Sequence, residues 1–182
     1  MSAGSPALEL HRLEAEHARP EFSCGDPDID EFFHKDSIVG CQELLCVTYV
    51  FMENGKAVSF FSISNDSIKK DEVPRSAFDR AMSVLPRGKR YSSMPAAKIG
   101  RLGVSKEFKR AGYGGRVLNW LKVSFTQQNK TGCRFLVVDA YNTEEVINFY
   151  LTNGFQFLTS KDEKDKTRIM YFDLLTFSRA PA

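Results

Sequence analysis

The sequence predicts one α/β domain that spans residues 1–182, and three observations predict it. Two runs of β-branched and aromatic residues flank an Asn-Gly pair, which is a strong signal for a β-hairpin. A later strand pattern leads through a glycine-rich turn into a helix with a periodic apolar stripe. A further buried strand, a helix and a closing pair of strands complete the pattern. Because no internal repeat, linker or low-complexity tract interrupts it, a single domain explains the whole chain.

The composition is that of an ordinary globular chain. Of the 182 residues, 42% are hydrophobic and 26% are charged, and the formal net charge is +2. A chain of this length buries about 70% of the surface that its unfolded form exposes, which excludes intrinsic disorder and a small disulfide-stapled scaffold. The first residues lack a signal-peptide pattern, and no run approaches the roughly 20 apolar residues of a membrane span. We therefore expect a cytoplasmic protein without a membrane partner.

Cysteines and histidines show no metal-site spacing. The four cysteines include no Cys-x-x-Cys pair, and the three histidines lie in the first fifth of the chain. The sequence therefore predicts free thiols in a reducing compartment and no bound metal.

The first third of the chain is expected to hold one helix and three strands. Asp26-Pro27-Asp28 combines an N-cap, a proline at the first helical position and an acidic first turn. Asn54-Gly55 marks the hairpin turn. The expected elements are a strand at 7–13, a helix at 27–38, and strands at 44–52 and 57–63.

Residues 66–95 break this pattern with three prolines and a glycine, and predict a polar, basic insertion with a short helix near 76–84. Charge is concentrated around this insertion. Residues 66–116 include 13 basic and 5 acidic residues, so they carry +8 while the rest of the chain carries −6.

The remaining elements lie between residue 97 and the C-terminus. Two glycines within the strand expected at 97–105 predict a bulge or a close approach of another group to the backbone. Asn142 and Glu145 predict a capping-box start for the last long helix, and Asn153-Gly154 predicts its end. The expected elements are a strand at 97–105, a helix opened by the turn at 109–115, a strand at 134–140, a helix at 142–153, and strands at 155–158 and 167–175.

The glycine-rich turn carries the clearest chemical signal. A helix N-terminus offers unpaired N–H groups and a partial positive charge, and glycines let an anion approach the backbone closely. Lys109 and Arg110 add positive charge, which favours a phosphate or pyrophosphate ligand. A plain connecting turn is the alternative that these residues leave open. The spacing excludes a Walker loop, and Val117 stands where a dinucleotide-binding fingerprint needs glycine.

Together these motifs resemble the GNAT superfamily of acetyl-CoA-dependent N-acetyltransferases. The family signature is a strand, a Gln/Arg-x-x-Gly-x-Gly/Ala turn that opens a helix, a second strand, and a helix with a Phe/Tyr-Tyr-x-x-x-Gly-Phe block. The match covers residues 97–158 through Leu102-Gly103-Val104, Lys109 to Gly115, Leu136-Val137-Val138 and Phe149 to Phe155. Lys109 stands where the family usually has Gln or Arg. Lysine keeps the positive charge of arginine but lacks its planar guanidinium group.

The resemblance implies an α/β (α+β) fold with a mixed, bent sheet, helices on both faces and splayed central parallel strands. It also implies acetyl-CoA as cosubstrate, with its pantetheine on the main chain of the first strand and its pyrophosphate on the amides of the turn. Asn142 is a weaker candidate, because capping the next helix would explain it equally well. The implied cofactor-binding residues are Leu102, Gly103, Val104, Lys109, Arg110, Ala111, Gly112, Tyr113, Gly114, Gly115 and Asn142.

The implied reaction is direct attack of a primary amine on the thioester. By the resemblance, Tyr150 donates a proton to the departing sulfur, and the backbone N–H of Val104 stabilises the oxyanion. A phenol with an ordinary pKa of about 10 stays protonated at neutral pH. The residues alone leave open that Tyr150 is a core aromatic on the same face as Val146 and Ile147. No general base is identified, so a water chain or an already neutral amine is expected to take the amine proton.

Residues 22–26 and 95–104 are similar to the GNAT toxins of bacterial toxin–antitoxin pairs, which acetylate the amino group of aminoacyl-tRNA. This resemblance implies aminoacyl-tRNA as the amine substrate, with an antitoxin protein and a second copy of the chain as candidate partners. The +8 segment suits tRNA, although phosphate binding by the turn explains part of its charge. Two alternatives stay open: a metabolic or protein N-acetyltransferase of a small amine or peptide amine, and a non-enzymatic acetyl-CoA-binding module.

If the basic segment at 66–116 binds tRNA, changing Arg87, Lys89 and Arg90 together to alanine is expected to weaken tRNA binding. The affinity should also fall less steeply with salt concentration, because fewer counterions are released on binding. The measurement is tRNA affinity at several salt concentrations. Unchanged affinity in the triple variant would exclude these three residues as a tRNA contact.

Overall fold

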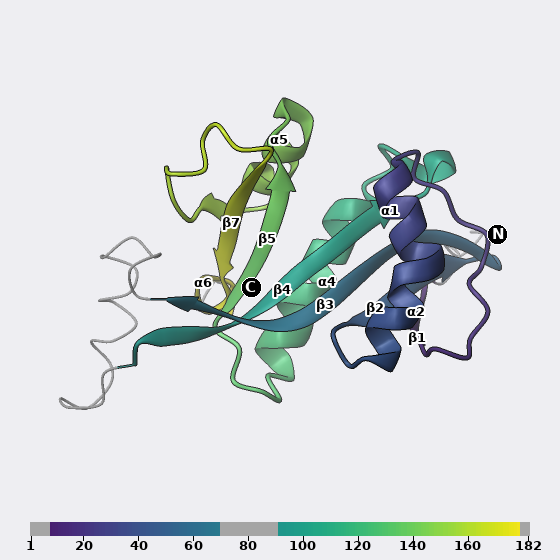
Figure 1. Ribbon diagram of the computed structural model, residues 1–182, viewed down its shortest axis with the longest axis horizontal. Helices are drawn as coiled ribbons and strands as arrows, with labels where there is room; N and C mark the ends of the chain where they lie inside the picture. Colours follow the sequence, from purple (N-terminus) through teal and green to yellow (C-terminus); the bar gives the residue numbers. More distant parts are fainter. Residues whose placement is uncertain (1–7, 70–90, 179–182) are drawn as a thin grey trace, which may run out of the picture. The chain divides into compact units, whose positions relative to one another are not determined.

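The computed structural model describes residues 8–69 and 91–178 (Figure 1). Its strands form a seven-stranded mixed sheet in the order β1-β2-β3-β4-β5-β7-β6, which confirms the predicted α/β fold class. No helix within these described ranges is both long and apolar enough to cross a membrane.

The elements are β1 (Glu9–Leu13), α1 (Pro27–Glu31), the π-helical η1 (Phe32–Asp36), α2 (Ser37–Gln42), β2 (Val47–Glu53), β3 (Lys56–Lys69), β4 (Ser93–Val104), the 3-10 helix η2 (Lys106–Phe108), α4 (Tyr113–Gln127), β5 (Phe135–Tyr141), α5 (Glu144–Thr152), β6 (Gln156–Phe157), β7 (Thr167–Asp173) and α6 (Leu174–Ser178).

The chain divides into two compact units. The first unit comprises Met1–Ser64 and Ile99–Trp120, and the second unit comprises Asn65–Lys98 and Leu121–Ala182. Strands β3 and β4 and helix α4 contribute residues to both units. The short helix predicted near 76–84, together with Arg87, Lys89 and Arg90, lies outside the described residues.

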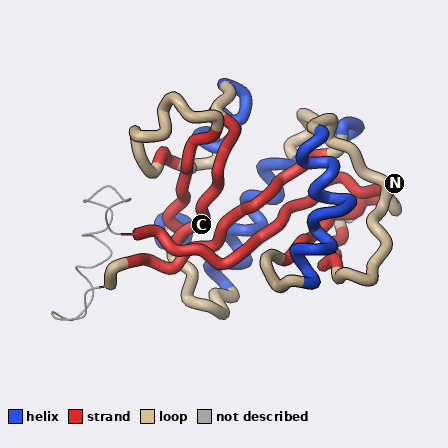
Figure 2. The backbone as a smooth tube through the Cα atoms, in the orientation of Figure 1, coloured by secondary structure: helices blue, strands red, loops and turns tan. Residues whose placement is uncertain are grey.

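The hairpin predicted at Asn54-Gly55 is present in the first unit (Figure 2). Strands β2 and β3 pair antiparallel, with Glu53 opposite Lys56. Asn54 and Gly55 have φ of +52° and +78°, which is the combination of positive values that a two-residue type I′ turn requires. Strand β1 pairs antiparallel with β2.

Helices cover both faces of the strands in the first unit. Phe60 of β3 packs against Phe33 of η1, with ring centroids 4.7 Å apart. The next residue, Phe61, packs against Trp120 of α4, with centroids 5.6 Å apart. Because successive side chains of a strand point to opposite faces, the helical segment from α1 to α2 and helix α4 lie on opposite sides of β3. The predicted placement of helices on both faces therefore holds for this unit.

The first helix begins where the sequence predicts and continues further. The Asp26 side chain accepts hydrogen bonds from the amides of Asp28 and Ile29, at 3.0 and 3.4 Å, and Pro27 takes the first helical position. The helical path then passes through η1 and α2 to Gln42, beyond the predicted end at residue 38.

A leucine in a left-handed backbone conformation ends α2. Leu44 has a φ of +57°. Its amide donates to the Cys41 carbonyl at 3.2 Å, and the Leu45 amide donates to the Gly40 carbonyl at 2.8 Å. These two bonds form a Schellman motif, in which glycine ordinarily takes the position of Leu44. The strand predicted at 44–52 is therefore wrong at its start, because β2 begins only at Val47.

The second unit is built on the antiparallel pair β5 and β7, with Phe135 opposite Asp173. One face of this pair carries Phe172, which packs against Phe155 just beyond α5, with ring centroids 5.6 Å apart. The other face carries Phe135 and Tyr171, whose rings lie 5.8 Å apart in a buried apolar cluster. Both faces of the pair are therefore part of the core of this unit.

Strand boundaries in the second unit differ from the prediction. Strand β3 extends to Lys69 and β4 begins at Ser93, so both described ends of the predicted insertion at 66–95 are strand. The strand predicted at 155–158 is reduced to the two residues of β6. The end of β3 and the start of β4 lie within the sheet, and their polar sequence does not predict strand because strand formation there depends on pairing with neighbouring strands.

The strand predicted at 167–175 is also too long. Strand β7 stops at Asp173, whose carboxylate accepts two hydrogen bonds from Arg134, at 2.7 and 2.8 Å. The same carboxylate accepts a hydrogen bond from the Leu175 amide at 3.0 Å, and the chain turns into the short helix α6. An ionised side chain that satisfies a helix-start amide thus ends the strand.

All four cysteines are free, as the sequence predicts. Burial raises the pKa of both Cys24 and Cys133 to about 11. These two thiols therefore stay protonated and poorly nucleophilic at neutral pH.

Replacing Leu44 with glycine is expected to raise the free energy of unfolding by about 0.5 kcal/mol. The left-handed conformation costs a residue with a β-carbon about 1 kcal/mol or more, which exceeds the entropic cost of glycine. The Leu44 side chain is 91% exposed, so little burial is lost. Chemical denaturation measures the change.

The matched control is Leu45→Gly, because Leu45 is also exposed but is not among the residues with positive φ. Glycine at position 45 is expected to lower stability. A Leu44→Gly protein that is less stable than the parent would contradict the assigned strain.

Candidate functional site

The glycine-rich turn leads from β4 into α4 in the first unit. After Val104 the chain forms the 3-10 helix η2, and the Ala111 amide donates to the Phe108 carbonyl at 3.3 Å. Arg110 and Gly112 then adopt positive φ of +64° and +83°. These two left-handed residues redirect the chain so that α4 begins at Tyr113.

The start of α4 leaves main-chain amides available to a ligand. The first bond of the helix runs from the Arg116 amide to the Gly112 carbonyl, at 3.1 Å. The amides of residues 113–115 therefore lie in the first helical turn, where an α-helix offers them no internal acceptor. A β-carbon placed at Gly112 would meet no atom within 4 Å, so the approach to this backbone is open. Lys109 and Arg110 are exposed beside it.

This geometry fits a phosphate or pyrophosphate group. Anions are stabilised at a helix N-terminus by its N–H groups and its partial positive charge. One part of the predicted cradle needs adjustment, because the Ala111 amide is already bonded to Phe108. The amides that fit an anion are those from Gly112 to Gly115.

Tyr113 fixes the position of this helix start. Its hydroxyl donates to the Glu53 carboxylate, with both carboxylate oxygens at 2.8 Å. Its ring packs edge-on against Phe108 at 5.5 Å, and the Arg116 guanidinium lies 5.2 Å from the ring centroid. The hydrogen bond to Glu53 raises the pKa of Tyr113. The sequence carries no local signal for this pairing, since the two residues are far apart in the chain.

The three strand residues predicted to hold the cofactor, Leu102, Gly103 and Val104, end β4. Strand β4 runs through both of its glycines, and the predicted close approach is present at each: a β-carbon at Gly100 would lie 2.9 Å from the Ser62 hydroxyl oxygen. A β-carbon at Gly103 would lie 2.7 Å from the Phe60 ring and 3.1 Å from Ile29. Gly103 is therefore required by the aromatic core beneath the strand.

Arg101, which precedes these residues, is held by groups of the same unit. Its guanidinium pairs with Asp28 at 3.2 Å and lies 5.5 Å from the centre of the Phe32 ring. Its amide donates to the Ser62 hydroxyl at 2.9 Å. These contacts connect β4 with both α1 and β3.

Tyr150 lies on α5 in the second unit and is only 6% exposed. Its ring packs against Phe149 and Phe155, with centroids 5.0 and 5.3 Å away. Burial raises the pKa of its hydroxyl well above the usual value, so the phenol stays protonated at neutral pH. Among residues 8–69 and 91–178, no group is hydrogen-bonded to this hydroxyl. The hydroxyl hydrogen is therefore not committed to another described group.

Asn142 does not cap α5, so that part of the prediction is wrong. The N-cap position is Thr143, and no side chain caps this helix. The Asn142 side-chain amide donates instead to the carbonyls of Glu163 and Asp165, at 3.0 and 2.9 Å. Both donors of this amide hold the loop before β7, which leaves neither of them for a cofactor.

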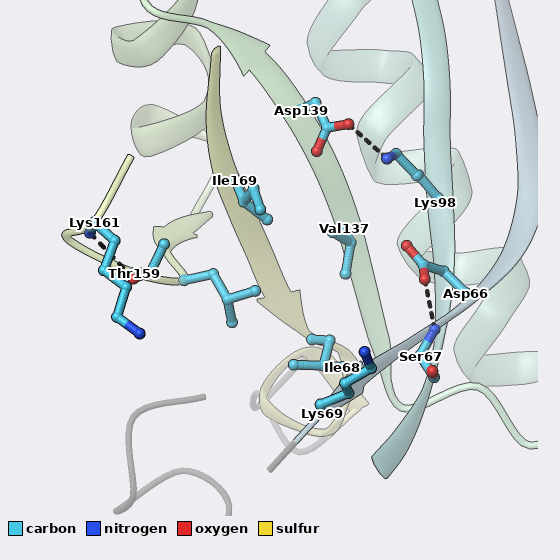
Figure 3. A pocket seen from close by; sticks show the side chains of 11 residues that line it. Asp66, Ser67, Ile68, Lys69, Lys98, Val137, Asp139, Thr159, Lys161 and Ile169 are labelled. Atoms are coloured by element: carbon cyan, nitrogen blue, oxygen red, sulfur yellow. Dashed lines mark hydrogen bonds and ion pairs between the residues drawn. The ribbon is translucent and has the colours of Figure 1, made fainter. Parts of the chain in front are cut away.

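The second unit also contains a cavity of about 570 Å³ (Figure 3). Its apolar wall belongs to the core cluster around β5 and β7, and its other side chains are polar or charged. Lys98 of β4 forms an ion pair with Asp139 of β5 at 2.5 Å on one side of it. The lining residues are Asp66, Ser67, Ile68, Lys69, Lys98, Val137, Asp139, Leu158, Thr159, Lys161 and Ile169.

Asp139 is the carboxylate that the sequence reasoning missed. The charged residues of β4, Lys98 and Arg101, are both cationic, so that strand by itself offers no base. The structure supplies a carboxylate to Lys98 from the neighbouring strand β5. The sequence offers one signal for it: Asp139 is an acidic residue between the apolar Val138 and Ala140, and in β5 it is exposed while both neighbours are buried.

Replacing Tyr113 with phenylalanine is expected to lower the free energy of unfolding by about 1–2 kcal/mol at neutral pH, because Glu53 loses its donor. Since the folded-state pKa of Tyr113 is raised, the contribution is present below about pH 10 and is lost as pH rises through that raised pKa. Denaturation at several pH values measures it. Tyr91→Phe, at an exposed tyrosine, is the control. Equal stability of the Tyr113→Phe and parent proteins at pH 7 would disprove the role of this bond.

The sequence comparisons connect part of the chain to a toxin. No protein-family model matches the chain. It is similar to a probable toxin TacT of Sinorhizobium fredii, with 29% identity over 104 residues, which are 56% of this chain and 54% of that protein. The chain thus spans about half the length of this curated relative.

Solved structures of toxins share the fold over almost the whole chain. A complex of AtaT with acetyl-methionyl-tRNAfMet has a TM-score of 0.76 at 17% identity and covers 94% of this chain and 98% of that one. A tyrosine-to-phenylalanine variant of KacT has a TM-score of 0.77 at 16% identity, with the same coverage. A similar variant of AtaT, bound to the C-terminus of the antitoxin AtaR and acetyl-CoA, has a TM-score of 0.68 at 15% identity over 94% of this chain and 96% of that one. The fold of this protein is therefore the fold of these toxins.

Proposed function

We propose that this protein is an acetyl-CoA-dependent N-acetyltransferase of the GNAT toxin type, which transfers an acetyl group to the amine of aminoacyl-tRNA. The observation that carries the proposal is Tyr150: a buried, protonated phenol with no hydrogen-bond partner among the described residues. The Tyr150 hydroxyl is not one of the buried polar atoms that lack a partner in the described part of the chain, so solvent reaches it. A phenol that stays protonated and can be reached by a substrate atom is suited to donate a proton.

The first unit would bind the cosubstrate. Acetyl-CoA, when bound, supplies the acetyl group as a thioester. The amides from Gly112 to Gly115, which begin α4, would hold its pyrophosphate together with the exposed side chains of Lys109 and Arg110. The main chain of Leu102, Gly103 and Val104 would hold its pantetheine arm. Support for this assignment also comes from the related fold of AtaT, which has been solved with acetyl-CoA.

Each unit would supply one group for acyl transfer. In the first unit, the Val104 amide would stabilise the carbonyl oxygen as the amine nitrogen bonds to the carbonyl carbon. In the second unit, Tyr150 would donate its proton to the sulfur as the carbon–sulfur bond breaks. The proton released by the amine leaves through water, and the phenolate is reprotonated from the same solvent. The products are the acetylated amine and the free thiol.

Aminoacyl-tRNA is the acceptor that the observations favour. The sequence relative is named a probable toxin, and the AtaT complex contains acetyl-methionyl-tRNAfMet. In this chain, the cavity of the second unit combines an apolar wall with three lysines and the carboxylates of Asp66 and Asp139, and Asp139 pairs with Lys98. An apolar wall with a few polar groups suits an aminoacyl group. An antitoxin protein and a second copy of the chain are the partners that this class of toxin implies.

The test is thiol release from acetyl-CoA over a panel of charged tRNA, peptides with free N-termini, and small polyamines or amino sugars. Release with charged tRNA alone supports the proposal. Release with peptides or small amines would identify a protein or metabolic N-acetyltransferase instead. Acetyl-CoA binding without release from any acceptor would identify a binding module and would refute the proposal.

Replacing Tyr150 with phenylalanine is expected to lower kcat by about 100-fold or more, because the leaving sulfur loses its proton donor, while KM for acetyl-CoA stays unchanged. Steady-state thiol release measures both. Tyr171→Phe is the matched control, because Tyr171 is buried in the same unit but donates to Gln156 at 3.2 Å. Unchanged turnover in Tyr150→Phe with acetyl-CoA still bound would show that Tyr150 is not the donor.

A further inference from the structure

Lys122 is a buried lysine in the part of α4 that belongs to the second unit. It is only 7% exposed, which is rare for a lysine without a carboxylate partner. No ion pair of Lys122 with an acidic side chain occurs in the described part of the chain. Burial lowers the pKa of this ammonium. A residue that bears this desolvation cost needs a compensating interaction.

The compensation comes from the end of α5. The Lys122 ammonium donates to the Asn153 carbonyl at 2.5 Å. It also lies 4.2 Å from the centroid of the Phe172 ring and 5.9 Å from that of Phe155. Asn153 is the C-cap residue of α5, so the ammonium meets the negative end of that helix.

The same helix end is bonded to Tyr150. The Tyr150 carbonyl accepts hydrogen bonds from the amides of Asn153 and Phe155, at 3.1 and 3.0 Å. The Phe155 ring, in turn, packs against the Tyr150 ring at 5.3 Å. Lys122 therefore contacts two residues, Asn153 and Phe155, that each contact Tyr150 directly. No other lysine with a described side chain is hydrogen-bonded to this turn.

Packing alone does not explain a lysine at this position. Methionine has a similar length and would fill the space between the Phe155 and Phe172 rings without desolvating a charge. What methionine cannot do is donate to the Asn153 carbonyl, which is one of the orphan carbonyls of a helix C-terminus.

We propose that Lys122 is a positioning residue for Tyr150: its ammonium holds the C-terminal turn of α5 and thereby keeps the tyrosine hydroxyl in one place. This inference rests on the proposed function, in which Tyr150 donates a proton. Misplacement of a reacting group by about 1 Å can cost as much as 100-fold in rate, so a loosened turn has a measurable effect.

The first test is a double-mutant cycle of Lys122→Met and Tyr150→Phe, with kcat and KM for acetyl-CoA measured for all four proteins. Lys122→Met is expected to lower kcat by about tenfold and to change KM by less than about twofold. In the Tyr150→Phe background the same substitution is expected to change kcat by less than about twofold, because no donor remains to be positioned. Lys130→Met, at an exposed lysine beyond the end of α4, is the control and leaves kcat unchanged.

The second test needs no turnover. Amide hydrogen exchange of Asn153 and Phe155, the two amides bonded to Tyr150, is expected to be at least about tenfold faster in Lys122→Met than in the parent or in Lys130→Met. Lys122→Arg retains a cationic donor and is expected to keep most of the protection and turnover. This variant also tests the proposal if Lys122→Met does not fold, because an arginine protein that folds but loses protection contradicts it.

The outcomes separate the two proposals. Loss of kcat by Lys122→Met that is equal in both backgrounds, or unchanged exchange at Asn153 and Phe155, would overturn the positioning role while leaving Tyr150 as donor. Absence of thiol release from any acceptor in the parent protein would overturn the proposed function. Unchanged kcat in Tyr150→Phe would exclude Tyr150 as the donor and, with it, the positioning role of Lys122.

Discussion

The free amides at the start of α4 can hold an anion only if that helix end stays in one place, and the hydrogen bond from Tyr113 to Glu53 keeps it there. Glu53 is the last residue of β2, beside a tight hairpin turn, so the helix start is tied to the sheet and not to a loop. A site made of main-chain groups depends on backbone position more than on any side chain. This one bond therefore supports the rest of the candidate cofactor site.

The two chemical roles proposed for the chain need opposite environments. Lys109 and Arg110 are exposed, where their side chains can attract phosphate from solution. Tyr150 is buried, and burial raises the pKa of its hydroxyl, so the proposed donor keeps its proton at neutral pH. Lys122 shares the buried environment but carries a charge, and the Asn153 carbonyl and the Phe172 ring replace its water.

Local signals in the sequence predicted the fold well. The Asn54-Gly55 turn, the Asp26 cap and the Gly154 helix end each depend on backbone geometry that few residue types satisfy, and all three are present. Leu44 was misread because leucine takes the place of glycine in a helix cap. The end of β7 at Asp173 and the role of Asn142 depend on partners distant in the chain. The sequence does not indicate that Lys122 is buried, because a lysine on a helix ordinarily faces water.

Gly103 links the aromatic core to the strand proposed to hold the cosubstrate, and this has an evolutionary consequence. Any side chain at position 103 would press on the Phe60 ring. A larger residue at 103 would need a smaller one at 60 and room beside Ile29 and Phe22, and the path between the two sequences passes through a less stable intermediate. Selection for core stability therefore also conserves the backbone surface offered to a ligand, even where binding itself is under no selection.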